Sequence, residues 1–412
     1  MNQQEVNILQ TFMKKLLFTL SLCLTLTAYN QTWESVASLP AGASVRHHPI
    51  TFSIGGIGYL VAGAKPAIGV LGDFYSYNPD ADSWTTLPDF PGLSRGYSYG
   101  VTSDTKGYLG FGYHYNEDTF EEYALNDLWE FDPVTGDWTE LAPFPGTPRY
   151  HPAMVFLDDK IYVGVGGSDF GDLKDWWVYD ITADTWTEKT EFPASERHHP
   201  YYFAIGEYVY VGFGHHNADI FNDLYRYDPI TDTWTAMASL PEQGRVAGTQ
   251  FSYEGKGYIL SGQGETHSNL PTGEFWEYNP STNSWLELTA HPGGGRWAPG
   301  SFMIDSKVYF TCGEANEGEK KDMFVYDFNL SAGLSTTSTS SILVYPNPSH
   351  GIINVQGDFK DYTTIELIDA SGQVLLQVTS TNQTLDVSHL SAGIYYLRFV
   401  GSDVRTEKLI LE

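Results

Sequence analysis

The sequence predicts an all-β protein with a large domain of repeated four-stranded sheets, followed by a small C-terminal β domain. Aromatic residues make up 15% of the 412 residues, charged residues make up 18%, and there are 41 glycines. This composition is typical of short strands joined by tight turns. A sequence pattern recurs six times between residues 32 and 330, and a polar Ser/Thr/Gly stretch, residues 331–341, follows it. We interpret that stretch as a linker.

The N-terminal segment has the features of a secretory signal peptide. Two lysines precede an apolar run over residues 16–26, and the small Ala28 follows. We expect residues 1–28 to be the signal, with Met13 as an alternative start. The alternative of a membrane anchor needs a longer apolar run, so no transmembrane segment is expected after signal removal. Cys312 would then be the sole cysteine, without a disulfide partner.

Each repeat is marked by residues in fixed register. An arginine comes first, a tyrosine follows 13 residues later and a glycine 17 residues later, in all six copies. Four β-rich runs fill a copy, as in HPYYFAI, YVYVGFG, DLYRYD and TWTAM between residues 199 and 237, with Gly, Asp and Asn in the turns. Four short antiparallel strands repeated at this period predict the blades of a β-propeller.

Residues 32–330 resemble the kelch family. The residues that carry the resemblance are the arginine-led first strand, IYVGVGG at 161–167, the N-D-L-[WY]-x-[YF]-D-P segments and the T-W strands. The last repeat has no tryptophan strand after it, whereas TWESV at 32–36 has no repeat before it. Pairing the two removes both open sheet edges. We therefore predict a six-bladed kelch β-propeller closed by an N-terminal strand.

The loop lengths indicate which face of the propeller binds ligands. The substantial length changes fall in the interval from the repeat glycine to the next aromatic residue, between the second and third strands. Such a loop emerges beside the connection into the next arginine, and variable loops on a rigid scaffold commonly bind ligands. The predicted ligand-binding residues are Arg46, Arg95, Arg149, Arg197, Arg245, Arg296, His114, His215 and Glu314.

A structural role for the arginines is the alternative. Each arginine would then bond loop carbonyls or acids of the adjacent blade, such as Glu196, Glu242 or Glu314.

Histidines gather beside the arginines, including His47, His48, His151, His198 and His199. Neutral imidazole binds transition metals, but a repeated HHP is better explained as a packing unit. We therefore expect no metal and no cofactor. The repeated tryptophans and tyrosines are expected to pack between sheets. Better candidates for stacking on a sugar are loop aromatics, namely Phe120, Tyr123, Phe170, Trp176 and Trp297.

Residues 342–412 resemble the type A C-terminal sorting domain of the type IX secretion system of Bacteroidetes. The matching segments are YPNP at 345–348, DASG at 369–372, DVS at 386–388, GIY at 393–395 and KLI at 408–410. The resemblance implies a small β-sandwich, the type IX secretion machinery as a partner, and secretion or placement on the outer cell surface via the periplasm. An accessory immunoglobulin-like binding module is the alternative.

The net charge of −29 argues against nucleic-acid binding, which needs Lys and Arg to neutralise phosphates. We expect a secreted or cell-surface binding protein, rather than an enzyme, that recognises a glycan or a protein partner at the arginine-lined face. The alternative is a carbohydrate-active enzyme of the sialic-acid epimerase type. Arginines would hold the carboxylate of an acidic sugar in a bidentate fashion, and Glu265 or Glu314 would act as acid and base. A third possibility is a propeller that only displays loops in a surface assembly.

Overall fold

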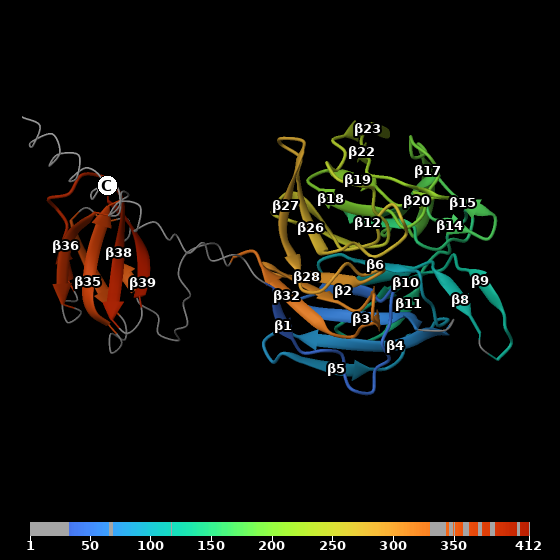
Figure 1. Cartoon of the computed structure of the whole chain (residues 1–412), viewed down its shortest axis with the longest axis horizontal. Coiled ribbons are helices and arrows are strands. Elements are labelled where there is room, and N and C mark those ends of the chain that lie inside the picture. Colours follow the sequence, from blue (N-terminus) through green and yellow to red (C-terminus); the bar gives the residue numbers. More distant parts are fainter. Residues whose placement is uncertain are drawn as a thin grey trace, which may run out of the picture. The chain divides into compact units, whose positions relative to one another are not determined.

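The computed structural model describes residues 33–329, except 66–68 and 117, and the C-terminal residues 343–345, 349, 351–356, 362–369, 373–379, 384–401 and 404–411. Every regular element within these ranges is a β-strand (Figure 1). The expected signal peptide, residues 1–28, and linker, residues 331–341, lie outside them. Contacts divide the chain between residues 330 and 331. Among the described residues, no helix has the length and apolar character needed to cross a membrane.

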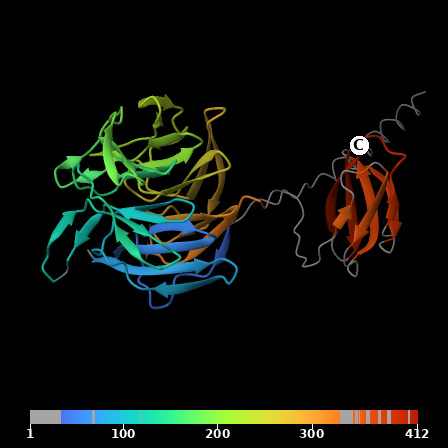
Figure 2. The ribbon, with the colours of Figure 1, turned by 180° about the vertical axis from the view of Figure 1, so that it is seen from behind.

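Residues 33–329 hold six antiparallel four-stranded sheets, seen from both sides in Figures 1 and 2. The first strands are β2 (Ile50–Ile54), β6 (Tyr99–Thr102), β12 (Ala153–Leu157), β18 (Tyr201–Ile205), β24 (Thr249–Tyr253) and β28 (Gly300–Ile304). The second strands are β3 (Ile57–Lys65), β7 (Gly107–Gly110), β13 (Lys160–Gly164), β19 (Tyr208–Gly212), β25 (Lys256–Leu260) and β29 (Lys307–Thr311). The third strands are β4 (Gly69–Asn78), β10 (Leu128–Phe131), β16 (Trp176–Asp180), β22 (Leu224–Asp228), β26 (Gly273–Asn279) and β32 (Met323–Asp327). The fourth strands are β5 (Ser83–Leu87), β11 (Trp138–Glu140), β17 (Thr185–Lys189), β23 (Thr233–Met237), β27 (Ser284–His291) and β1 (Glu34–Val36).

The position of a strand in its sheet follows from its sequence pattern. The second strand β13 is nearly all apolar, and four of its five residues are buried. The fourth strand β17, TWTEK, alternates, and it is partly or fully exposed along its length. A continuous apolar run suits a strand covered on both faces, whereas alternation suits a strand with one face in water.

The first and last sheets are joined to each other. Each first strand lies beside the first strands of two other sheets, and β28 lies beside β2. The N-terminal strand β1 pairs with β32, so that Glu34 lies opposite Val325. The N-terminal strand thus forms the outer strand of the last sheet.

A backbone hydrogen bond from the repeat glycine links consecutive sheets. The N–H of Gly214 donates to the carbonyl of Arg245 (3.0 Å), and the N–H of Gly313 donates to Arg46 (3.0 Å), from the last repeat to the first. Gly214 has a φ of +75°, and a Cβ there would lie 2.5 Å from the carbonyl oxygen of His198. Only glycine fits this conformation and this close approach.

The repeated tryptophans pack between sheets, as expected. Trp186 of one sheet donates its indole N–H to the carbonyl of Ala142, which follows the fourth strand of the preceding sheet (2.9 Å). Asp184 accepts bonds from the Ala142 N–H and from the hydroxyl of Tyr179. The same indole bond recurs at Trp84, Trp234 and Trp285.

The C-terminal unit contains two sheets with one core between them. One sheet is β33 (Leu343–Tyr345), β34 (Ile352–Gln356) and β37 (Thr384–Asp386). The other, in spatial order, is β36 (Val374–Thr379), β35 (Tyr362–Asp369), β38 (Gly393–Gly401) and β39 (Val404–Leu411). Ile353 and Val355 of the first sheet pack in one cluster with Ile365, Leu367 and Leu397 of the second. This is a small β-sandwich.

Candidate ligand-binding face

The six repeat arginines are buried, and none is more than 4% exposed. Arg197 is typical. Its two terminal nitrogens donate to the two carboxylate oxygens of Asp223 (2.5 and 2.9 Å), Nη1 also donates to the carbonyl of Phe213 (2.9 Å), and Nε donates to the carbonyl of Ser195 (3.1 Å). The carboxylate partners of the six arginines, in order, are Asp73, Asp127, Asp175, Asp223, Glu274 and Asp322.

This arrangement differs from the expectation that arginines line a ligand-binding mouth. The guanidinium donors of Arg46, Arg95, Arg149, Arg197 and Arg296 are taken up by protein carbonyls and carboxylates. Burial lowers the pKa of Arg46, but the hydrogen bond and charge of Asp73 outweigh it, and the pKa ends above its usual value. The alternative, in which the arginines bond protein carbonyls and carboxylates, describes their environment better. Its partners were expected to be acids of an adjacent blade, but they come from the arginine's own sheet.

Arg245 is bound less completely than the other five. Its Nη1 donates to Glu274 (2.9 Å), whereas its buried Nε and Nη2 have no partner among the described residues. Glutamate replaces aspartate at this one position, and a single oxygen faces the guanidinium.

The connections into the arginines lie beside the loops between second and third strands. The residue after each arginine pairs with the residue after each repeat glycine, as in His198 with His215 and Trp297 with Glu314. We call this side of the unit the loop face. Four of its loops contain two-stranded hairpins, which are β8 (Tyr113–Tyr115) with β9 (Glu122–Ala124), β14 (Gly167–Ser168) with β15 (Gly171–Asp172), β20 (His215–His216) with β21 (Asp219–Ile220), and β30 (Glu314–Ala315) with β31 (Gly318–Glu319).

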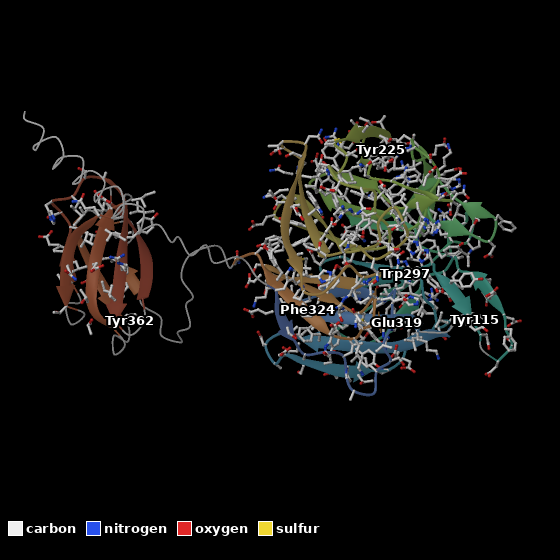
Figure 3. The ribbon with its side chains drawn as sticks, in the orientation of Figure 1. Tyr115, Tyr225, Trp297, Glu319, Phe324 and Tyr362 are labelled. Atoms are coloured by element: carbon white, nitrogen blue, oxygen red, sulfur yellow. The ribbon has the colours of Figure 1, made fainter. Side chains whose placement is uncertain are left out.

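Two hairpins of the loop face carry exposed aromatic side chains. Phe120 is 74% exposed beside the β8–β9 hairpin, which projects from the unit in Figure 1, and Phe170 is 92% exposed between β14 and β15. Tyr123 is 41% exposed. Trp176 does not belong with them, because it is fully buried in the core. Trp297 is partly buried and lies near the middle of the unit in Figure 3.

A cavity of about 390 Å³ opens between these hairpins and the centre of the unit. Its lining residues are Tyr97, Tyr113, Tyr150, His151, Ser168 and Asp169. The rings of Tyr113 and Tyr150 meet edge to face at 5.7 Å. The sequence patterns did not single out these tyrosines, because they stand at variable positions next to the constant arginines and glycines.

The predicted residues His114, His215 and Glu314 lie on three different sheets. His114 Nδ1 lies 2.7 Å from the carbonyl oxygen of Ser94. The ring of His215 lies 3.9 Å from that of His198, tilted by 48°, and burial lowers the pKa of His215 to about 4. Burial, and then the charge of nearby Glu319, raise the pKa of Glu314. Within the described ranges, no hydrogen bond or ion pair joins the three predicted residues, so they do not form a single acid–base constellation.

The loop face also holds a carboxylate–histidine group that sequence reasoning missed. Asp172 Oδ1 lies 2.7 Å from Nδ1 of His198, and its Oδ2 lies 2.9 Å from Nδ1 of His216. Burial raises the pKa of Asp172, but its hydrogen bonds and ion pairs with the two histidines outweigh this effect and lower it. The members come from neighbouring repeats, so no local motif marks them.

The second residue after each arginine adopts a left-handed backbone in all six repeats. The residues are His48, Tyr97, His151, His199, Ala247 and Ala298, with φ between 48° and 62°. The three histidines meet at the centre, where Nε2 of His48 lies 3.0 Å from that of His199 and 3.1 Å from that of His151. A second cavity, of about 360 Å³, is lined by residues of the six first strands, and His48 lines it too.

Comparisons with known proteins agree with this architecture. Residues 121–262 match the KLHDC2/KLHL20/DRC7 Kelch-repeats domain, and residues 343–412 match the secretion system C-terminal sorting domain. Kelch-like protein terF of Aspergillus terreus is 30% identical over 148 residues, 34% of this chain and 31% of that protein. Kelch-like protein 30 of Homo sapiens is 32% identical over 108 residues, 26% of this chain and 18% of that protein. The chain thus spans less than a third of the length of these curated relatives.

One matched segment lies in each unit of the structure. The sorting domain indicates secretion or cell-surface localisation through the periplasm, and kelch repeats indicate protein–protein interaction. The chain therefore contains kelch repeats in an all-β propeller-type unit and carries a secretion-system C-terminal sorting domain.

Proposed function

We propose that this chain is an exported binding protein whose loop face holds a protein partner. The observation that carries the proposal is the pair of solvent-exposed phenylalanines, Phe120 and Phe170, on hairpins of neighbouring sheets. Large apolar side chains exposed on neighbouring loops of one face are candidate anchors for a partner. The net charge of −29 favours a partner with a basic surface, because complementary charge speeds association and excludes acidic competitors.

Site-specific photo-crosslinking tests this proposal. A photoreactive phenylalanine analogue is placed at position 120 or 170 of the full chain, expressed in its own cells. Val134 and Ile230 provide matched controls, because they are 91% and 84% exposed and lie in turns between third and fourth strands, on the opposite side of the unit. We expect the same protein adduct from positions 120 and 170 and none from 134 and 230. Equal adducts from all four positions, or adducts from the controls alone, would contradict the proposal.

A neutral glycan is the second candidate ligand, and the tyrosine-lined cavity favours it. Tyr97, Tyr113 and Tyr150 offer ring faces and hydroxyls, and Asp169 offers a carboxylate acceptor for sugar hydroxyls. The residues that line this cavity include no arginine or lysine. Saturation-transfer NMR with neutral and carboxylated oligosaccharides should detect neutral sugars, and Tyr150→Ala should abolish the signal. Preferential binding of carboxylated sugars would exclude this candidate.

The buried arginines do not support the alternative of an enzyme that acts on an acidic sugar. It required guanidinium groups free to bind a carboxylate, and the six repeat arginines are buried. A binding role needs none of them at the surface.

A further inference from the structure

Three histidines from three different sheets converge on one point at the centre of the unit. The side chains of His48, His151 and His199 are 3 to 5% exposed, and their ligand nitrogens lie within 4.8 Å of one another. Two of the Nε2–Nε2 distances are 3.0 and 3.1 Å. Imidazoles that share a tetrahedral zinc ion at 2.0–2.1 Å have nitrogens about 3.3 Å apart. We propose that His48, His151 and His199 bind one divalent transition-metal ion.

Hydrogen bonding alone does not satisfy this cluster. A neutral imidazole has one N–H and one lone pair. If both contacts to His48 are hydrogen bonds, either the Nε2–H groups of His151 and His199 share the one lone pair of His48, or the Nε2–H of His48 is shared between their lone pairs. In both arrangements the buried Nδ1 atoms of His151 and His199 have no partner among the described residues. If the hydrogens sit on Nδ1 instead, the three Nε2 lone pairs lie close together. The rings of His151 and His199 stack at 3.3 Å, so they must tilt for both lone pairs to reach one cation, which would then turn the repulsion into three bonds.

A fourth histidine orients one of the proposed ligands. His48 Nδ1 lies 2.7 Å from Nδ1 of His47. When Nε2 of His48 binds a metal, its Nδ1 carries the hydrogen and donates to His47, an outer contact that fixes the tautomer and the ring orientation. Burial also lowers the pKa values of His48, His151 and His199 well below their usual range. The imidazoles are therefore neutral at neutral pH, as metal ligands must be.

The backbone of the repeat directs these side chains inward. His48, His151 and His199 occupy the left-handed position two residues after the repeat arginine, with φ of 51°, 49° and 52°. The same position is Ala247 or Ala298 in two other sheets. The left-handed turn is therefore a property of the repeat and does not require histidine. Histidine at three of the six equivalent positions, with alanine at two and Tyr97 at the sixth, places three ligands together at the centre of the unit.

The site has openings through which an ion and a fourth ligand can approach. His151 lines the tyrosine cavity of the loop face, and His48 lines the cavity between the first strands. Three imidazoles leave one position of a tetrahedral ion free. Nitrogen ligands favour Zn²⁺, Cu²⁺ and Ni²⁺ over Mg²⁺ and Ca²⁺, which prefer oxygen. Zinc, copper or nickel is thus the class of ion expected.

Metal binding by the full chain, purified with a tag that contains no histidine, tests the proposal. After treatment with EDTA, titration with Zn²⁺ by calorimetry should show one tight site per chain. Co²⁺ in its place should give the absorption of a tetrahedral complex. His48→Ala, His151→Ala and His199→Ala should each weaken Zn²⁺ binding at least ten-fold. Gln variants at the same positions keep a polar side chain if an alanine variant fails to fold.

Two controls make the result specific. His198, His199 and His215 form a second group of adjacent ligand atoms, which shares His199 with the first. His215→Ala should leave Zn²⁺ binding unchanged, and loss of binding in this variant alone would overturn the assignment. The ring of Trp297 lies 4.7 Å from that of His48, so Cu²⁺ should quench fluorescence less in Trp297→Phe. Zn²⁺ binding that no triad variant weakens, or the absence of a tight site in the wild-type chain, would refute the proposal.

Discussion

Replacing Arg197 by methionine tests whether the buried arginines stabilise their sheets. The variant loses two charge-assisted bonds to Asp223 and two bonds to the carbonyls of Phe213 and Ser195. Breaking a buried ion pair from one side costs about 3–5 kcal/mol, since the other charge stays behind. Asp223 is 25% exposed, so water can reach its carboxylate and the lower end applies. We expect a loss of about 3 kcal/mol.

Arg245→Met is the matched control. Arg245 has one charge-assisted bond, and its removal also deletes two buried nitrogens without partners, each of which costs about 1–3 kcal/mol. The net loss should be about 1 kcal/mol or less.

Urea unfolding followed by tryptophan fluorescence measures both variants. All 11 tryptophans lie in residues 33–297, so the signal reports the propeller unit and not the C-terminal sandwich. If Arg197→Met unfolds within 1 kcal/mol of the wild-type chain, or Arg245→Met loses as much as Arg197→Met, the stabilising role assigned to the bidentate pairs is wrong.

Three further predictions follow from the same structure. Gly214→Ala should lower the melting temperature far more than Gly206→Ala, because a Cβ at 214 meets the His198 carbonyl oxygen at 2.5 Å, whereas nothing lies within 4 Å at 206; equal effects in calorimetry would contradict this. In metal-free buffer, stability should be complete above about pH 6.5 and fall towards pH 4, because buried His48, His151 and His199 stay neutral in the folded chain but are protonated in the unfolded chain. A melting temperature constant from pH 7 to 4.5 would argue against it. The thiol of Cys312 is fully buried and burial raises its pKa to about 11, so mass spectrometry should find it alkylated by iodoacetamide only after unfolding, and rapid labelling of the native protein would contradict its burial.

The strand architecture could be predicted from the sequence because it depends on backbone register. The constant interval from arginine to glycine sets the lengths and register of the first two strands of each sheet. The left-handed φ and the close contacts at the end of the second strand require glycine there. The unpaired tryptophan strand at the N-terminus predicted the β1–β32 pairing for the same reason.

The role of the arginines could not be predicted in this way. The carboxylate that pairs with each arginine follows it at a distance that changes with the intervening loop, as with Asp127 after Arg95 and Asp223 after Arg197. The carboxylates do stand in register, four residues before the repeat aromatic, but their interval from the arginine varies, so the pairing was not read from the sequence, and scarce cations in an acidic chain suggested ligand contact. The histidine cluster was hidden for a different reason. The HHP segments do recur, but only the left-handed turn of the repeat brings residues from separate sheets to one point.

The pairing of β1 with β32 has a consequence for the order in which the molecule assembles. Glu34 lies opposite Val325, so the last sheet has all four strands only when β1 from the start of the unit and β32 from its end are both present. Once β1 pairs with β32, the N-terminal and C-terminal ends of the unit hold each other in place.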